Sequence, residues 1–147
     1  MRGYFGIGIE HIKSEVNLGT LWRSAYCLGA AFTFTIGRRY APQCSDTCKS
    51  WRHLPHMDYL TIDNLVIPRD CRLVGIEITE GAIPLVSFQH PERCIYLLGA
   101  EDHGITEGAR KRCHEIVYIP SRICLNVSVA GSIVMYDRLA KVGDIDE

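Results

Sequence analysis

Apolar runs that favour strands alternate along the chain with segments that favour helices. The strand-like runs lie at residues 4–10, 31–37, 72–79, 93–99 and 114–120. The helix-like segments lie at residues 17–29, 61–66, 106–113 and after Asn126, and a long polar loop follows the second strand to about residue 57. This alternation predicts an α/β fold with a mostly parallel sheet flanked by helices, forming one domain over residues 1–147.

The segment ICLNVSVAGSIVMYDR, residues 123–138, is ambiguous by composition. Its β-branched residues favour a strand, but its small residues would gain little in a half-buried strand. A helix fits better, because Asn126 is a good N-cap and Arg138 and Lys141 would place cations near the negative end of the helix dipole. The small residues of this helix are Ser128, Ala130, Gly131 and Ser132. Composition alone does not explain why this helix carries four small residues.

The first predicted helix carries an apolar stripe on one side. The stripe consists of Leu18, Leu21, Trp22, Ala25 and Leu28. At 100° per residue, Arg23 points to the opposite side and is therefore presented rather than buried. Periodicity alone favours an ordinary surface arginine, because exposure is the default for this residue type.

Length and composition limit the classes of protein that the chain can belong to. The chain has 147 residues, of which 47% are hydrophobic, and a formal net charge of −1. This charge argues against a generally basic protein that coats nucleic acid. No apolar run approaches the roughly 20 residues that span a bilayer, and the N-terminus does not resemble a signal peptide. The sequence therefore predicts a cytoplasmic protein with no membrane partner.

The cysteine pattern favours free thiols over disulfides or metal ligands. The seven cysteines form no CxxC pair, which makes a reducing compartment the better interpretation. Cys44, Cys48, His53 and His56 are zinc-type ligands, but their spacings are too short for the usual zinc fingers. No metal site is predicted.

Glycine-containing turns suggest a ligand site at the ends of two strands. The segment GIG at residues 6–8 lacks the third glycine of a dinucleotide-binding motif, since position 11 is His11. After the fourth strand, Gly99 and Gly104 bracket Glu101, and residues 118–126 form a second polar turn after the next strand. Open α/β sheets bind ligands beyond the carboxyl ends of their strands, so these two turns could share one ligand.

Three separated motifs carry a resemblance to a known family. They are N-x-G-x-x-x-R-x-A at residues 17–25, L-G-x-E-x-x-G at residues 98–104, and I-P followed by L-N-V-S-V-A within residues 119–130. In this order and spacing they resemble the signature motifs of the SpoU (TrmH-type) RNA ribose methyltransferases of the SPOUT superfamily. The resemblance spans nearly the whole chain.

The resemblance implies a fold that periodicity could not predict. Residues 95–141 or so would thread through a loop to make a deep trefoil knot, an exception to the usual rule against threading. The chain would form a homodimer through the knot region and bind S-adenosylmethionine. The small residues of the last helix would then admit the threaded loops and the second subunit, although packing against the chain's own sheet explains them equally well.

The resemblance also implies roles for individual residues. Arg23 would be the catalytic arginine, and Asn17, Glu101 and Asn126 would support the same site. The residues implied to bind the cofactor are Leu98, Gly99, Ile119, Cys124, Leu125 and Ser128. Cys124 replaces a serine that is frequent in the family. Because arginine stays protonated, phosphate anchoring and stabilisation of an alkoxide suit Arg23 better than general-base catalysis, which is the family's proposal.

The loop after the second strand is the predicted RNA-binding segment. Its cations Arg38, Arg39, Lys49 and Arg52 outweigh its one acidic residue, Asp46, by three charges. Tyr40 and Trp51 are interleaved with them and could stack on bases, and residues 110–112 extend the basic character. An ordinary solvated loop is the alternative interpretation.

Three functions are compatible with these patterns. The favoured one is S-adenosylmethionine-dependent methylation of a ribose 2′-hydroxyl in tRNA or rRNA, with tRNA preferred. The second is a catalytically silent, knotted RNA-binding dimer, which the presence of Cys124 motivates. The third is a nucleotide-binding α/β protein with no RNA partner.

Overall fold

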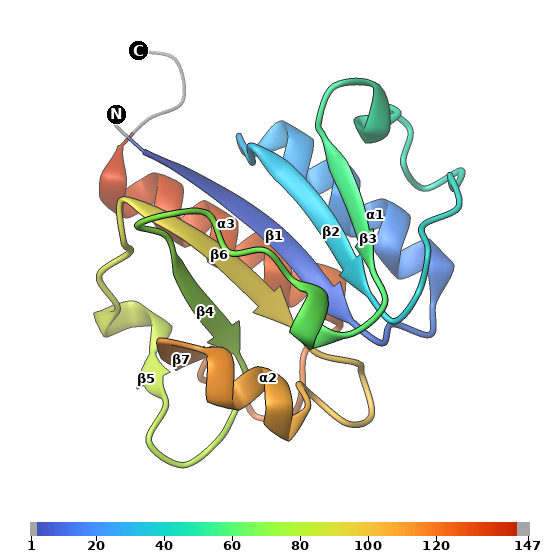
Figure 1. Cartoon of the computed structure of the whole chain (residues 1–147). Helices are drawn as coiled ribbons and strands as arrows, with labels where there is room; N and C mark the ends of the chain where they lie inside the picture. The colour runs from blue at the N-terminus through green and yellow to red at the C-terminus, as the bar shows by residue number, and fades with distance from the viewer. Residues whose placement is uncertain (1–2, 144–147) are drawn as a thin grey trace.

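The computed structural model describes residues 3–143, and its seven strands form one sheet (Figure 1). The strands are β1 (Tyr4–Glu10), β2 (Phe32–Ile36), β3 (His56–Tyr59), β4 (Arg72–Ile76), β5 (Ile83–Pro84), β6 (Arg93–Leu98) and β7 (Glu115–Tyr118). Their order in the sheet is β3-β2-β1-β6-β4-β7-β5, and every neighbouring pair is parallel. The predicted parallel α/β fold is confirmed.

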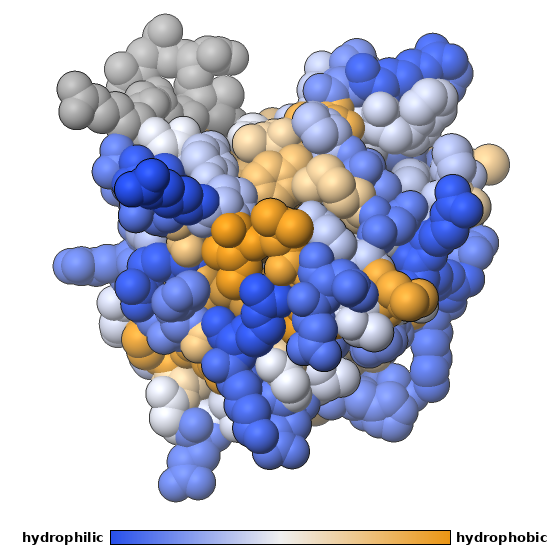
Figure 2. Space-filling view, in the orientation of Figure 1, coloured by the Kyte–Doolittle hydropathy of each residue, from blue (hydrophilic) through white to orange (hydrophobic). Residues whose placement is uncertain are grey.

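Helices cover both faces of the sheet. The α-helices are α1 (Glu15–Cys27), α2 (Glu107–Arg112) and α3 (Val127–Val142), and the 3-10 turns are η1 (Ser50–Arg52), η2 (Ile62–Asn64) and η3 (Leu85–Ser87). Helices α1 and α3 lie behind the sheet in Figure 1, whereas α2 and η2 lie in front of it. Each face has its own apolar core. Figure 2 shows the front face, where apolar surface gathers over the middle of the sheet among polar residues.

Two strands and one turn differ from the predictions. The polar loop predicted to reach residue 57 instead gives way to β3 at His56, and the two-residue strand β5 was not predicted. Side-chain hydrogen bonds link β3 to β2: Thr33 Oγ1 lies 2.8 Å from His56 Nδ1, and Thr35 Oγ1 donates to Asp58 Oδ1 at 2.5 Å. A strand that is linked to its neighbour by polar side chains cannot be predicted from the pattern of hydrophobic residues. The helix predicted at residues 61–66 is also wrong, since only the short turn η2 forms there.

The apolar stripe predicted for α1 packs against α3 and the sheet. Leu18, Leu21, Trp22 and Ala25 are buried, and the side chain of Ser14 caps the helix by accepting from Asn17 N at 3.2 Å. Helix α3 crosses this face at Gly131. A Cβ atom there would lie 2.4 Å from Leu21 Cδ1 and 2.9 Å from Leu98 Cδ1. Gly131 therefore serves packing within the chain, which is the alternative that the sequence left open.

A buried arginine, Arg138, anchors the second half of α3 to the segment before β6. Arg138 donates to Pro91 O at 2.7 Å, to Glu92 O at 2.9 Å and to the Tyr96 hydroxyl at 3.2 Å. The sequence predicted only that Arg138 is a cation near the negative end of the helix dipole, and it did not predict that the side chain is buried. Its guanidinium instead satisfies the carbonyls that lead into β6, because a buried charge needs such partners.

No helix within residues 3–143 is long and apolar enough to cross a membrane. The extent of the domain, residues 1–147, and the knot over residues 95–141 stay predictions.

Substituting Gly131 with valine should destabilise the protein by about 1 to 3 kcal/mol, because the added methyl groups overpack the contact between α3, α1 and β6. Urea unfolding measures this loss. Gly108→Ala in α2 is the matched control, since a Cβ there meets its nearest atom at 3.6 Å. The control should be neutral or gain up to about 1 kcal/mol from helix propensity. A Gly131→Val variant that unfolds with the wild-type midpoint would contradict the close contact.

Candidate active site

A pocket of about 270 Å³ lies beyond the carboxyl ends of β4, β6 and β7. Both turns that the sequence singled out contribute to it, residues 99–104 after β6 and residues 119–125 after β7. Its lining includes the predicted site residues Leu98, Gly99, Glu101, Ile119, Cys124 and Leu125. The two turns therefore border one pocket, and their sharing of one ligand stays a prediction.

The loop after β6 is a tight turn that needs its two glycines. Gly104 N donates to Ala100 O at 2.9 Å, and Gly104 has a φ of 68°, in the left-handed region. A Cβ atom at Gly99 would lie 2.1 Å from the carbonyl carbon of Gly104. The turn thus folds back on the end of β6 and presents backbone groups and Glu101 to the pocket.

Two carboxylates that the sequence analysis did not identify hold this loop in place. Glu10, only 1% exposed at the end of β1, accepts from Thr106 N at 2.7 Å and from Thr106 Oγ1 at 2.8 Å. Glu77, in the pocket wall, accepts from Arg110 Nε at 2.8 Å and from Arg110 Nη2 at 3.1 Å. Glu10 could have been noticed in the sequence, because it is the one charged residue in an otherwise apolar strand.

A chain of side-chain hydrogen bonds joins the three motifs. Asn126 Nδ2 donates to Asn17 Oδ1 at 3.1 Å, and Asn17 Nδ2 donates to Glu101 Oε1 at 3.0 Å. Asn126 Oδ1 accepts from Ser128 N at 2.9 Å and so caps α3, as predicted. The starts of α1 and α3 and the loop after β6 therefore meet at one point beside the pocket.

A second ion pair lies next to this chain. Lys13, just before α1, contacts Asp102, which lines the pocket beside Glu101. The hydrogen bond from Lys13 lowers the pKa of the Asp102 carboxyl and raises the pKa of the Lys13 ammonium. Both groups therefore stay charged at neutral pH, and they tie the loop after β6 to the segment that leads into α1.

Four predicted catalytic and cofactor residues do not line this pocket: Asn17 and Asn126, which bond to each other beside it, and Arg23 and Ser128. Arg23 is on the exposed side of α1, as its periodicity predicted, and within residues 3–143 it makes no side-chain hydrogen bond or ion pair. Ser128 is buried, and its hydroxyl donates to Asn126 Oδ1 at 2.6 Å. It lines a groove between α1 and α3 instead. The catalytic role of Arg23 and the cofactor contact of Ser128 stay predictions.

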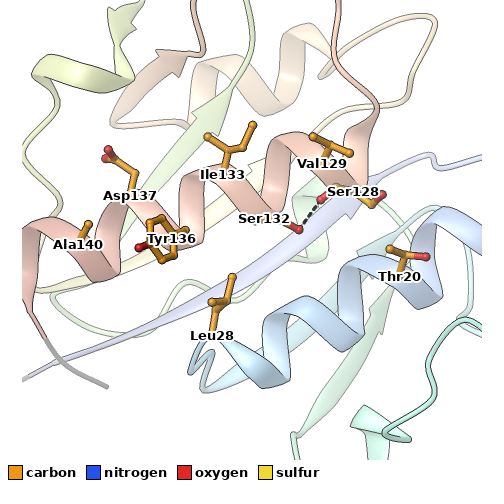
Figure 3. Close-up of a pocket in the computed structure, with 9 residues that line it drawn as sticks. All are labelled: Thr20, Leu28, Ser128, Val129, Ser132, Ile133, Tyr136, Asp137 and Ala140. Atoms are coloured by element: carbon orange, nitrogen blue, oxygen red, sulfur yellow. Dashed lines mark hydrogen bonds between the residues drawn. The ribbon is translucent and has the colours of Figure 1, made fainter. Parts of the chain in front are cut away.

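The groove between α1 and α3 has a volume of about 560 Å³ and a mainly apolar wall (Figure 3). It is lined by Thr20 and Leu28 of α1 and by Ser128, Val129, Ser132, Ile133, Tyr136, Asp137 and Ala140 of α3. Ser132 Oγ donates to Ser128 O at 2.7 Å, the interaction drawn in the figure. Val129, Ile133 and Tyr136 are exposed large side chains, so α3 presents an apolar surface with no cover in the described part of the chain.

The cations of the predicted RNA-binding loop have different surroundings. Arg38 is engaged internally: it donates to Ile12 O at 3.1 Å and to Lys13 O at 2.7 Å, and it pairs with Glu15 at 2.6 Å. Arg39, Lys49 and Arg52 are exposed. The structure thus brings Arg38 to the start of α1 and leaves the other three cations facing outward.

The cysteines and histidines of the same loop have other partners. His53 stacks on Tyr26, and His56 bonds to Thr33 and lies 2.9 Å from Asp58. Within residues 3–143 no group of three or more His, Cys, Asp or Glu side chains is arranged to hold a metal ion.

Together, the parallel sheet and the pocket between the loops after β6 and β7 define an α/β protein with a ligand site at the carboxyl edge of its sheet. Residues 5–136 match the family described as the SpoU rRNA Methylase family. The chain belongs to this family.

Three similar proteins illustrate the relationship. The 23S rRNA (guanosine-2′-O-)-methyltransferase RlmB of Acinetobacter baylyi is 32% identical over 142 residues, covering 89% of this chain and 57% of that protein. AviRb, a SpoU methyltransferase of Streptomyces viridochromogenes solved with AdoMet, has a TM-score of 0.81 at 22% identity over 97% of this chain and 59% of its own. A structure described as giving insights into the 2-OH methylation of C/U34 on tRNA has a TM-score of 0.81 at 19% identity, covering 95% and 96% of the two chains. This chain therefore spans less than two thirds of the length of the first two.

Replacing Asn17 tests the hydrogen-bond chain. Asn17→Asp keeps the acceptor for Asn126 but places a carboxylate against Glu101, so the two negative charges repel each other once both groups are ionised. The variant should therefore lose stability relative to wild type as pH rises from about 4 to 7, by about 1 kcal/mol at this partly exposed position. Urea unfolding at both pH values measures this. Asn17→Ala is the control, and its loss of unfolding free energy relative to wild type should be the same at both pH values. An equal deficit of Asn17→Asp at both pH values would argue against the contact with Glu101.

Proposed function

We propose that the chain is an S-adenosylmethionine-dependent RNA methyltransferase that modifies a ribose 2′-hydroxyl. The observation that carries this proposal is the meeting of Asn17, Glu101 and Asn126 beside one pocket, in a member of the SpoU family. The name of the Acinetobacter relative and the AdoMet complex of AviRb support the same chemistry.

The residues around the pocket suit this cofactor. Leu98, Ile119 and Leu125 offer apolar walls for a purine ring. Gly99 leaves its backbone open to close approach, and Glu101 and Ser121 add polar groups that can bind hydroxyls. Bound S-adenosylmethionine would supply a methyl group on a positively charged sulfur. The chain itself must hold the ribose hydroxyl near that methyl group and stabilise the oxygen as it loses its proton.

Arg23 is proposed to anchor the RNA phosphate and to stabilise the developing negative charge on the ribose oxygen. A guanidinium stays protonated at neutral pH, so it suits charge stabilisation better than proton removal. Asn17, Glu101 and Asn126 would hold the loop after β6 and the start of α3 in position around the cofactor. This division of roles agrees with the exposure of Arg23 and with the internal hydrogen bonds of the other three.

A homodimer through the knot region is part of the same proposal. The groove between α1 and α3 and the exposed Val129, Ile133 and Tyr136 support it, because a stable interface needs such an apolar surface. Arg23 lies one turn after Thr20, which lines that groove. A second copy seated there would face Arg23, so the active site would be completed by two subunits.

The finer points of the proposal follow the sequence. We propose a deep trefoil knot over residues 95–141 within a single domain, RNA contacts from Arg39, Lys49 and Arg52, and a preference for tRNA over rRNA. Support for tRNA comes from the similar structure described as giving insights into the 2-OH methylation of C/U34 on tRNA, since this chain covers 96% of it. The seven free cysteines support a cytoplasmic location.

Methyl transfer from labelled S-adenosylmethionine to bulk tRNA and rRNA, purified from cells that lack the gene, tests the activity. Wild-type protein should label RNA, and Arg23→Ala should lower the rate about 100- to 1,000-fold, the cost of losing one charge-stabilising group. Arg69→Ala, an exposed arginine before β4, is the control and should retain the wild-type rate. Equal labelling by Arg23→Ala would refute the role of Arg23. Cofactor binding without any labelling by wild type would favour a silent RNA-binding dimer.

Alkylation of Cys124 tests the cofactor pocket without measuring activity. Cys124 is exposed and lines the pocket, whereas the exposed Cys27 and Cys44 lie elsewhere. S-adenosylhomocysteine should slow the alkylation of Cys124 several-fold and leave that of Cys27 and Cys44 unchanged, as peptide mass spectrometry can show. Burial raises the pKa of Cys94 to about 11, so its thiol should stay unmodified throughout. If saturating S-adenosylhomocysteine does not slow the alkylation of Cys124, the proposal that this pocket binds the cofactor is wrong.

A further inference from the structure

Exposed aromatic and cationic side chains gather where the loop after β2 meets α1. They are Tyr26 of α1 and Lys49, Trp51, Arg52 and His53 of the segment around η1, and we call them the aromatic platform. The rings of Tyr26 and His53 are stacked, with centroids 4.5 Å apart and an interplanar angle of 15°. The Arg52 guanidinium carbon lies 5.0 Å from the centre of the Trp51 ring. The stacked pair thus fixes the loop to the helix.

The platform is held rigidly from beneath. Asp46, the one acidic residue between Arg38 and His53, is buried and accepts from the Tyr40 hydroxyl at 2.8 Å, from Ser50 N at 2.9 Å and from Ser50 Oγ at 2.6 Å. Its carboxylate therefore binds within the loop, and the charges that face outward are positive. Because the loop is ordered before any ligand arrives, binding loses little conformational entropy.

The platform is separate from the groove between α1 and α3. None of its residues lines that groove or the pocket at the carboxyl edge of the sheet. Tyr26 is 39% exposed and Trp51 is 41% exposed, so both aromatic side chains are accessible to a ligand. His53 and Arg52 each cover one face of these rings, and the rings remain partly exposed. Positive charge beside such rings matches a nucleic-acid strand, whose bases stack on aromatic rings and whose phosphates attract Lys and Arg.

We propose that the aromatic platform binds an unpaired nucleotide of the RNA substrate. A base would stack on Trp51 or on Tyr26, and Arg52 and Lys49 would neutralise the flanking phosphates. The base must be unpaired, because the faces of bases in a duplex are covered by their stacked neighbours. Arg23 lies one helical turn before Tyr26, so a strand that reaches Arg23 also passes the platform. This inference rests on the proposed function and restricts its substrate to single-stranded or loop RNA, without selecting a base.

Fluorescence anisotropy with a labelled ten-nucleotide RNA of mixed sequence, single-stranded or annealed to its complement, tests the platform. Wild type should prefer the single strand, and Trp51→Ala or Tyr26→Ala should weaken its binding about 5- to 100-fold, as expected for the loss of one stacked base. Trp51→Phe retains a ring and should recover most of the affinity. Arg52→Gln should lower the salt dependence by about one phosphate contact.

Two matched controls lie outside the platform. Val66→Ala removes an exposed apolar side chain, and Arg69→Gln an exposed cation, both in the segment before β4. Neither should change the affinity for single-stranded RNA. In methyl-transfer assays, Trp51→Ala should raise the KM for RNA and leave the KM for S-adenosylmethionine unchanged.

The outcomes separate this inference from the proposed function. Wild-type affinity in both Trp51→Ala and Tyr26→Ala, or equal binding of single strand and duplex by wild type, would overturn the platform even if RNA is methylated. Loss of a dimer in sedimentation of the Trp51→Ala variant would overturn it too, by making this surface a subunit contact. If the variants bind RNA more weakly but the wild-type protein methylates no RNA, the aromatic platform is supported as an RNA-binding surface and the proposed enzyme activity is rejected.

Discussion

The close contact of α3 with α1 and β6 at Gly131 determines how the candidate site is assembled. A side chain at this point would push α3 away from Leu21 and Leu98, and the two helices could not lie side by side on one face of the sheet. Their contact brings the start of α3 next to the start of α1. Asn126 and Asn17 can then bond to each other, and Asn17 reaches Glu101. One packing constraint thus brings together residues that are about 80 to 110 positions apart in the chain.

Carboxylates have two different tasks around the pocket. Glu10 and Glu77 are occupied by Thr106 and Arg110, and they hold the loop after β6 against the ends of β1 and β4. Glu101 bonds to an asparagine amide, a weaker neutral partner, and stays exposed at the pocket. Rigid support from hydrogen-bonded side chains around a less constrained site residue is what a precise binding geometry requires.

The sequence predicted the parts of the fold that depend on apolar periodicity and missed those that depend on pairing between polar side chains. The main strands, α1 with its buried stripe and α3 with its Asn126 cap were all predicted. Strand β3 was not, because its His56 and Asp58 bond to threonines on a neighbouring strand, and no local pattern reveals such partners. Arg38 illustrates the same limit in the predicted RNA loop: its charge suggested a ligand, but its carbonyl partners near Lys13 become apparent only in three dimensions.

The order of the strands has a consequence for synthesis on the ribosome. Strand β6 lies between β1 and β4, yet it follows both of them in the chain. Until residues 93–98 have left the ribosome, β1 has one unpaired edge. Strand β4 then has two, because its other neighbour, β7, follows β6 in the chain, and the two halves of the sheet cannot join. Pairing over such long separations is slow and leaves apolar strands open to aggregation. The nascent chain should therefore depend on chaperones until more than two thirds of it has emerged.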